Sequence, residues 1–424
     1  MIFSTFVPNY SYIWIGMQNK EFTFIDLFAG TSALSEGFVR CGFLPIAHIE
    51  MDKDACYTIK TRLAYHYLKN KSDIQKYQKY VTGNMSREEL YKAIPEDIIN
   101  SVINIEISDK TINDIFKKVD NSTIFKKTQK VDLIIGGPPC QAFSLLNRHT
   151  KDIEEDPRCY LYLQYGKFLQ HYHPLGFVFE NVLGILSAKN EHFNNIQKHF
   201  KGLGYNVYYS ILNAADFGVL QNRKRVIIYG WRADIDKGCP NIGTVENNWT
   251  CEDIFSDLVQ IRAGEEGCHY IAPPNRYLLS TGIRTENDIL TQHIARPLNK
   301  KDEEKYKMAI NKLYDEGIRI KNTDFPENIR TINNSTSFLD RFKVVDKKGK
   351  SHTVIAHIAK DGHYYIYPYL TTIRSISVRE AARLQSFPDD FYFEGSRSAM
   401  LKQIGNAVPP LMAFAIAKRI KELL

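Results

Sequence analysis

The stretch VDLIIGGPPCQAFS, residues 131–144, carries the strongest structural signal in the sequence. Its first five residues are apolar apart from Asp132, which is typical of a strand buried in a parallel sheet. Two glycines and two prolines follow and fix an unusual backbone path. Because ligands bind at the carboxyl ends of parallel strands, we expect Cys140 to lie at a functional site.

Short β-branched or aromatic runs alternate with longer helix-like stretches on both sides of this segment, from residue 22 to about residue 231. The alternation predicts β-α-β units and an α/β fold with a doubly wound, mostly parallel sheet. After Trp231 the spacing becomes irregular and is marked by Pro, Gly and Asn, which indicates a second, smaller mixed domain. The runs expected to form strands are FTFIDLF (22–28), LPIAHIE (44–50), VDLIIGG (131–137), GFVFENV (176–182), YNVYYSILNA (205–214) and RVIIYGW (225–231).

Four segments are predicted along the chain. They are an N-terminal extension at 1–20, a first domain at 21–238, a smaller domain at 239–376, and a closing segment at 377–424 that completes the first domain. The closing segment opens with a helical pattern, SVREAARLQSF, and ends on a helix that follows two prolines. We expect translation to begin naturally at Met17, just before the first strand.

Composition limits the classes of protein to consider. The 424 residues are 44% hydrophobic and 24% charged, which is ordinary globular usage and disfavours a disordered, fibrous or membrane protein. The apolar runs are too short to cross a bilayer, and the first residues do not resemble a secretory signal. A net charge of +7 suits a polyanionic partner without requiring one.

Seven cysteines are scattered through the chain without a CxxC pair, which predicts reduced thiols in a cytoplasm. Cys239, Cys251, Cys268 and His269 form the combination to be weighed as a zinc site. No two of these cysteines have the spacing of a ligand pair, so no metal is predicted. The favoured interpretation is that these cysteines are small buried hydrophobic residues.

The first predicted strand ends in DLFAG and a turn of small residues before a helix, which is typical of a site for a nucleoside-bearing cofactor. Twenty residues after Gly30, Glu50 ends the next strand, where its carboxylate can accept hydrogen bonds from both ribose hydroxyls. The turn reads GTSALSEG rather than GxGxxG, which disfavours a dinucleotide and favours S-adenosylmethionine. A purely structural turn remains the alternative.

Three further features carry candidate chemistry. Cys140 could be a nucleophile if nearby positive charge lowers the pKa of its thiol, and the alternative is an inert buried thiol. Glu180 ends a strand and could protonate a pyrimidine ring nitrogen, whereas a helix cap or surface acid is the alternative. In QNRKR (221–225), alternation places Arg223 and Arg225 on one face, where they could hold a base carbonyl or phosphates. The competing interpretation is a basic strand edge.

The order DLFAG, Glu50, GGPPCQ, ENV, QNRKR, REAARLQSFPD and QIGNAVPP resembles the DNA cytosine-5 methyltransferase family. The resemblance runs from residue 22 to the C-terminus, except for the region between Trp231 and about Ser335. GGPPCQ and QIGNAVPP are its most specific motifs. It implies the fold of S-adenosylmethionine-dependent methyltransferases, with a cytosine flipped out of duplex DNA as the substrate.

The resemblance also implies roles for individual residues. Cys140 would attack carbon 6 of the cytosine, Glu180 would protonate ring nitrogen 3, and Arg223 and Arg225 would hold the base or its loop. The other residues expected to contact the substrate are Gln141, Ser144, Asn181 and Gln221. Those expected to bind S-adenosylmethionine are Asp26, Phe28, Ala29, Gly30, Glu50, Met51, Glu106, Pro139, Asn406 and Val408.

Two departures from the family pattern affect the cofactor site. Ser32 and Ala33 stand where the family commonly has a Gly-Gly pair, so the resemblance does not determine the backbone path of this turn. The acid that approaches the adenine amino group is assigned to Glu106, with Asp109 as second choice, because an acid followed by Ile and a small hydroxyl residue fits the motif best.

The variable region, 239–376, would be the target-recognition domain for double-stranded DNA. His293, Arg296 and Arg148 are candidate phosphate contacts, with an ordinary solvated surface role as the alternative for each. The chain resembles prokaryotic modification enzymes that are monomers, act in the cytoplasm and are paired with a restriction endonuclease. Two rivals remain: a tRNA cytosine-5 methyltransferase, which would need a shorter recognition region, and a non-catalytic DNA-binding regulator.

Overall fold

The computed structural model describes residues 21–139, 160–187, 191–330 and 339–424. The chain forms two compact units. The sheet unit comprises the described residues up to Phe217 together with Lys224–Glu246 and Val408–Leu424, and the mixed unit comprises Gly218–Arg223 and Asn247–Ala407. The motif QNRKR and the closing segment 377–424 are therefore each divided between the two units.

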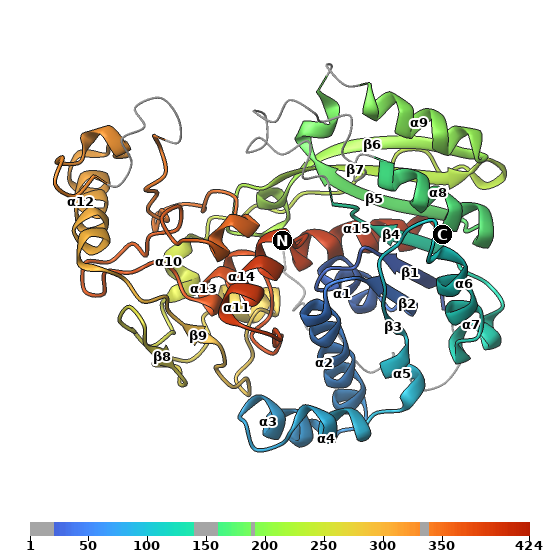
Figure 1. The fold of residues 1–424 in the computed structure, drawn as a ribbon, viewed down its shortest axis with the longest axis horizontal. Coiled ribbons are helices and arrows are strands. Elements are labelled where there is room, and N and C mark those ends of the chain that lie inside the picture. Colours follow the sequence, from blue (N-terminus) through green and yellow to red (C-terminus); the bar gives the residue numbers. More distant parts are fainter. Residues whose placement is uncertain (1–20, 140–159, 188–190, 331–338) are drawn as a thin grey trace. The chain divides into compact units, whose positions relative to one another are not determined.

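A seven-stranded sheet forms the centre of the sheet unit (Figure 1), in the order β3-β2-β1-β4-β5-β7-β6. Neighbouring strands are parallel except that β7 runs antiparallel to both β5 and β6. The predicted α/β class with a mostly parallel sheet is confirmed. The strands are β1 (Thr23–Leu27), β2 (Leu44–Glu50), β3 (Val102–Asn104), β4 (Leu133–Gly136), β5 (Gly176–Val182), β6 (Tyr205–Asn213) and β7 (Lys224–Arg232).

Helices pack on both faces of this sheet, as expected for a doubly wound fold. The side chains of β1 alternate between the faces: Ile25 and Leu27 join the main core with residues of α6, α8 and α9, whereas Phe24 lies against Phe38 of α1. Helix α1 packs on the C-terminal helix α15, and Gly37 permits this approach because a Cβ there would lie 2.3 Å from the Ala413 carbonyl carbon. The helices of this unit are α1 (Ala33–Arg40), α2 (Lys53–Asn70), α3 (Ile74–Val81), α4 (Arg87–Lys92), α5 (Glu96–Asn100), α6 (Ile112–Asp120), α7 (Thr123–Thr128), α8 (Leu161–Tyr172), α9 (His192–Gly202) and α15 (Pro410–Leu423), with 3-10 turns η5 (Leu183–Leu186), η6 (Ala214–Phe217) and η7 (Ala233–Ile235).

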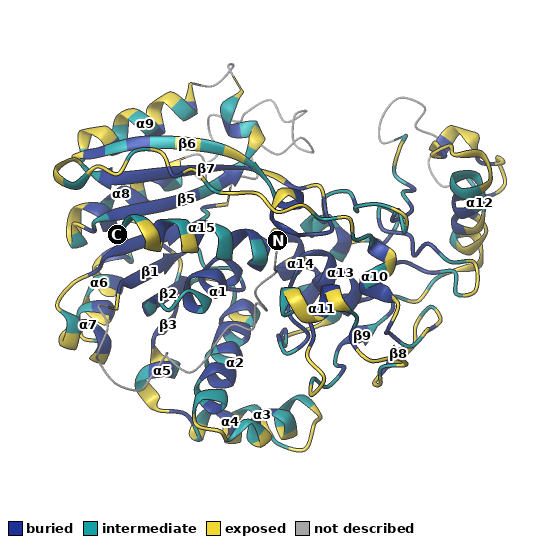
Figure 2. Ribbon diagram, turned by 180° about the vertical axis from the view of Figure 1, so that it is seen from behind, coloured by how far each residue is buried: buried dark blue, intermediate teal, exposed yellow. Residues whose placement is uncertain are grey.

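The mixed unit contains buried ion pairs and, apart from the 17-residue helix α12, mostly short elements. Its centre is α13, which a Ser377 capping box starts and which is largely buried (Figure 2). Arg383 of this helix bonds both Asp257 and Asp389 within the buried interior. The other elements are α10 (Cys251–Phe255), β8 (Glu266–Gly267), α11 (Arg276–Thr281), β9 (His293–Ile294), α12 (Lys300–Glu316), η8 (Asn322–Asp324), η9 (Ala356–Ala359), α13 (Val378–Leu384) and α14 (Arg397–Asn406).

None of the helices in the described ranges is both long enough and apolar enough to span a bilayer. In the same ranges, His, Cys, Asp and Glu side chains do not gather in groups of three that could hold a metal ion.

Candidate active site

The turn between β1 and α1 has a conformation that few sequences adopt. Phe28, Gly30 and Ser32 all have positive φ angles, of 55°, 57° and 62°. Only glycine adopts this region without steric cost, so the two other residues must be held there by their surroundings. The turn is tied to the next strand, because the Ala29 amide donates to the Ile49 carbonyl at 3.0 Å.

Glu50 fixes this turn at the end of β2. Its Oε2 accepts a hydrogen bond from the Gly30 amide at 2.8 Å, and its Oε1 accepts from the amides of Met51 and Asp52 at 2.9 and 2.8 Å. Burial raises the pKa of this carboxyl, while the amide hydrogen bonds oppose that shift. With one amide on Oε2, that oxygen keeps a lone pair for a further donor.

The surroundings of Glu50 suit a nucleoside. The Met51 side chain is 64% exposed directly beside the fixed carboxylate, which offers an apolar surface next to a hydroxyl acceptor. Asn104, at the end of β3, donates to the carbonyls of Glu50 and Met51 at 3.1 and 3.0 Å and so orients both. Sequence reasoning missed Asn104, because its strand is too short to give a pattern.

A buried hydrogen-bond group lies under the turn. The Ser32 hydroxyl lies 3.1 Å from Asp26 Oδ2 on β1 and 2.9 Å from His48 Nδ1 on β2. All three side chains are buried. Burial raises the pKa of Asp26, and the hydrogen bonds from His48 and Ser32 oppose this shift. Asp26 is thus placed to hold the turn through Ser32.

Replacing Ser32 with alanine is expected to lower the free energy of unfolding by about 1–3 kcal/mol, because buried Asp26 and His48 would lose a shared partner. Ser35→Ala is the matched control, since the buried Ser35 hydroxyl on the same helix has no partner in the described part of the chain. Urea unfolding measures both. Equal losses in the two variants would contradict the role given to Ser32.

Glu180 and Arg225 form an ion pair where β5 and β7 meet. Arg225 Nε lies 2.8 Å from Glu180 Oε1, and the two side chains are only 11% and 12% exposed. Burial lowers the pKa of the arginine, whereas Glu180 raises it. The cross-strand pairing of Val182 with Arg225 brings the two side chains together. Arg225 therefore orients the carboxylate of Glu180.

Gly137 lets the chain pass close to Glu180. A Cβ at this position would lie 2.7 Å from Glu180 Oε2, so a larger residue must displace the carboxylate. The adjacent Asn181 is buried, and its Nδ2 lies 3.5 Å from the Pro138 carbonyl. Pro139 is exposed at the end of the described segment. The end of β4 is thereby held against the end of β5.

Substituting Gly137 with alanine should destabilise the protein by about 1–3 kcal/mol, because the new methyl group overpacks the space beside Glu180. Gly202→Ala is a suitable control: a Cβ at Gly202 meets no atom within 4 Å. Chemical denaturation compares the two variants. If Gly137→Ala were as stable as the control, the close approach to Glu180 would be unimportant.

Four residues predicted from the motifs after β4 lie outside the described residues. They are Cys140, Gln141, Ser144 and Arg148.

Arg223 and Arg225 belong to different compact units, although alternation predicted a common face. Arg223 is fully buried in the mixed unit and donates to the carbonyls of Val354 and Gly405 at 2.6 and 3.2 Å. Gln221 is buried in the same unit, where its Nε2 donates to the Leu384 carbonyl at 3.0 Å. Strand β7 begins at Lys224, so Arg223 precedes the strand and the alternation rule does not apply to it.

The segment around Gln221 rests on the chain near His352. Asn222 donates to the Ser351 carbonyl at 2.8 Å, and Ser351 donates to the Leu220 carbonyl at 2.9 Å. The His352 ring stacks on Tyr365 with centroids 5.1 Å apart. Burial lowers the pKa of His352 to about 4.

His352 should therefore make stability depend on pH. Because the pKa of His352 is lower in the folded protein than in the unfolded chain, this residue contributes to the free energy of unfolding. The contribution is complete above pH 6.5 and is lost as the pH falls through about 4. The shift in the pKa of His352 corresponds to about 3 kcal/mol of the free energy of unfolding. His352→Gln should flatten the pH dependence of the free energy of unfolding between these values, measured by urea titration at several pH values. If the free energy of unfolding depended on pH in the same way in the wild-type protein and the variant, His352 would not be the cause of that dependence.

The remaining candidates are dispersed. Glu106 follows β3 and is exposed, while Asp109 pairs with Lys167 across the surface. Asn406 is exposed at the end of α14 in the mixed unit, and Val408 is buried in the sheet unit.

The interpretation of His293 as a phosphate contact or surface residue is wrong. His293 is fully buried, and its ring nitrogens lie 2.8 Å from the Ser377 hydroxyl and 2.8 Å from the Val259 carbonyl. Burial lowers the pKa of the imidazole, which leaves no exposed charge for a phosphate. Arg296 donates to the carbonyls of Ala359 and Lys360 at 2.8 and 3.1 Å.

Comparison with known proteins gives consistent matches over nearly the whole chain. The model of the C-5 cytosine-specific DNA methylase family matches residues 22–99 and 97–422. The type II methyltransferase M.Bpa9945I of Bacillus paralicheniformis is 38% identical over 94% of this chain and 98% of its own length. The type II methyltransferase M.DdeI of Desulfomicrobium norvegicum is 31% identical over 93% and 88%. A crystal structure of a prophage-encoded E. coli protein, described as a DNA modification methyltransferase, shares the fold with a TM-score of 0.63 and 22% identity over 95% of this chain and 99% of that chain.

Proposed function

We propose, on the premise that this chain belongs to the C-5 cytosine-specific DNA methylase family, that it methylates carbon 5 of a cytosine within a specific sequence of double-stranded DNA. The observation that carries the proposal is the Glu180 carboxylate, held by Arg225 and packed against Gly137, three residues before Cys140. Glu180, the candidate acid, therefore packs against the segment that leads to Cys140, the candidate nucleophile.

The chemistry follows from the reactivity of cytosine. The thiolate of Cys140 forms a bond to carbon 6, and the displaced electron pair makes carbon 5 nucleophilic. Glu180 donates a proton to ring nitrogen 3 and so accepts the charge that would otherwise build up on the ring. After methylation ring nitrogen 3 returns its proton to Glu180, a base removes the proton of carbon 5, the double bond between carbons 5 and 6 re-forms, and the thiolate of Cys140 leaves. Because these atoms are out of reach in a stacked duplex, the cytosine must be flipped out.

The residues around Glu50 fit S-adenosylmethionine. When bound, this cofactor supplies the electrophilic methyl group. Glu50 would accept hydrogen bonds from the ribose through the free lone pair of Oε2, and Met51 would cover one face of the adenine. Gly30, held by Glu50, would line the methionine side with Phe28 and Ala29. Supporting this assignment are the three amide donors on Glu50 and the exposed Met51 beside them.

The region 239–376 would recognise the target sequence. The two relatives are named type II methyltransferases, and we infer that this chain, like the modification enzymes it resembles, belongs to a restriction-modification system. In that setting methylation would protect DNA from a partner restriction endonuclease, and the protein would act as a monomer in a prokaryotic cytoplasm. The exposed and half-buried polar residues of the mixed unit supply the chemistry for such recognition.

A suicide substrate tests the proposal. The purified protein is incubated with labelled S-adenosylmethionine and duplex DNA that contains 5-fluorocytosine, with tRNA that contains 5-fluorocytosine in a parallel reaction. Fluorine on carbon 5 cannot leave as a proton does, so a denaturation-resistant adduct with DNA is expected, and its position identifies the target cytosine. An adduct with tRNA alone would reverse the substrate assignment. No adduct in either reaction would favour a non-catalytic regulator.

A further inference from the structure

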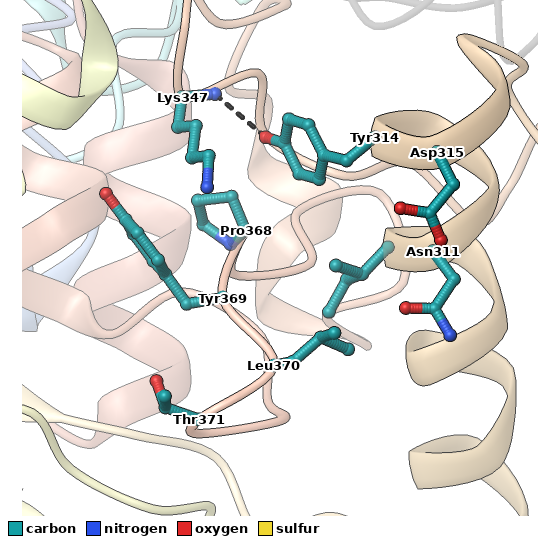
Figure 3. A pocket seen from close by; sticks show the side chains of 9 residues that line it. Asn311, Tyr314, Asp315, Lys347, Pro368, Tyr369, Leu370 and Thr371 are labelled. Atoms are coloured by element: carbon teal, nitrogen blue, oxygen red, sulfur yellow. Dashed lines mark hydrogen bonds between the residues drawn. The ribbon is translucent and has the colours of Figure 1, made fainter.

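A hollow of about 200 Å³ opens in the mixed unit between α12 and two loops, one at Lys347 and one at 368–371. This volume is well above the roughly 30 Å³ that one water molecule occupies in the liquid, so part of a larger molecule can enter. We call it the α12 hollow. Six of its lining residues matter here: Asn311, Tyr314, Asp315, Lys347, Tyr369 and Leu370 (Figure 3).

Lys347 is held in a fixed position on one side of the α12 hollow. Its Nζ lies 4.7 Å from the ring centroids of both Tyr314 and Tyr369, a distance at which a cation is attracted by an aromatic face. Its backbone amide donates to the Tyr314 hydroxyl at 3.1 Å, and its carbonyl accepts from the Glu252 amide at 3.0 Å. In the described ranges, no carboxylate forms an ion pair with this lysine. Lys347 is thus a positioned cation that forms no ion pair with the residues the structure describes.

Two polar side chains of α12 lie on the opposite side (Figure 3). Asn311 and Asp315 are four residues apart and so share one face of the helix. Neither side chain has a hydrogen-bond or ion-pair partner within the part of the chain that the structure describes, whereas the neighbouring Glu316 lies 3.8 Å from Lys312. Unpaired polar groups on a shared face are available to a ligand.

We propose that Asn311, Asp315 and Lys347 read base edges in the major groove of the duplex DNA. The inference rests on the proposed function and names specificity-determining residues for it. The three side chains match three different bases: asparagine pairs with adenine N6 and N7, lysine with guanine O6 and N7, and an acid accepts from cytosine N4. Leu370, 49% exposed at the rim, can contact a thymine methyl group.

The mixture of charges distinguishes base reading from backbone binding. A phosphate would be attracted by Lys347 but repelled by Asp315, so the acid would have no use in a pure phosphate site. Against a base-pair edge, which presents donors and acceptors side by side, both charges are used.

The proposal is tested by measuring which DNA sequences the protein prefers to methylate. Wild-type protein and the variants Asp315→Asn and Lys347→Gln methylate a pool of duplexes randomised around the target site, and methylated products are sequenced. Each variant should change the preference at one base pair by roughly 5- to 150-fold. Asp315→Asn should shift that preference from cytosine toward adenine, because the amide can pair with adenine N6 and N7. Glu316→Gln and Lys348→Gln are the matched neighbouring controls and should retain the wild-type preference.

The other outcomes overturn the proposal. If Lys347→Gln weakened binding equally for all sequences and made it less sensitive to salt, Lys347 would be a phosphate contact instead. Unchanged preference in both variants would exclude base reading by the α12 hollow alone, provided that the wild-type protein is active. A wild-type protein that methylates no duplex would overturn the proposed function, and this inference with it.

Discussion

Replacing Cys140 with serine is expected to abolish methyl transfer while the protein still folds and binds S-adenosylmethionine. A hydroxyl group is a much weaker nucleophile than a thiolate at neutral pH, so the bond to carbon 6 would not form and carbon 5 would stay unreactive. The loss should therefore be in kcat, by several orders of magnitude, with little change in cofactor affinity. Single-turnover methylation and isothermal titration with the cofactor measure the two quantities separately.

Cys239→Ser is the matched control for this variant. Cys239 is an exposed free cysteine of the sheet unit, as is Cys268 of the mixed unit, so the interpretation of these two cysteines as buried hydrophobic residues is wrong. The same atom replacement at Cys239 should leave the rate unchanged. With 5-fluorocytosine DNA, Cys140→Ser should form no denaturation-resistant adduct, whereas the control should. Substantial turnover by Cys140→Ser would refute covalent catalysis through this residue.

The strands that position the site could be predicted because they are apolar on both faces. LPIAHIE, for example, corresponds residue for residue to β2, which ends at Glu50. Two features lay beyond such patterns. Strand β3 has only three residues, and the antiparallel direction of β7 is decided by its pairing with β5 and β6. A sequence period gives the faces of a strand but not its direction.

The side-chain partners were less accessible to sequence reasoning. Alternation grouped Arg223 with Arg225, yet they occupy different compact units because the strand begins between them. His293 looked like a surface cation and is a buried hydrogen-bonding residue of β9. In each case the partner comes from a distant part of the chain: Val354 for Arg223 and Ser377 for His293. Local sequence contains no information on such pairings.

Glu180→Gln is expected to lower the methylation rate by about 10²- to 10⁴-fold, the range for loss of a general acid. The amide has nearly the shape of the carboxyl group and can still accept from Arg225, but it cannot donate the proton that ring nitrogen 3 requires. Rates measured at saturating cofactor and DNA isolate this effect from binding.

A second consequence separates catalysis from structure. The variant leaves the nearly buried Arg225 without its counter-charge, which should lower the free energy of unfolding by about 1–3 kcal/mol. Asp234→Asn breaks the exposed ion pair of Arg232, at the other end of β7, and should leave both the free energy of unfolding and the methylation rate nearly unchanged. If Glu180→Gln were destabilised as expected but methylated DNA at the wild-type rate, Glu180 would serve only to balance Arg225, and the proton for the cytosine ring would have to come from another group.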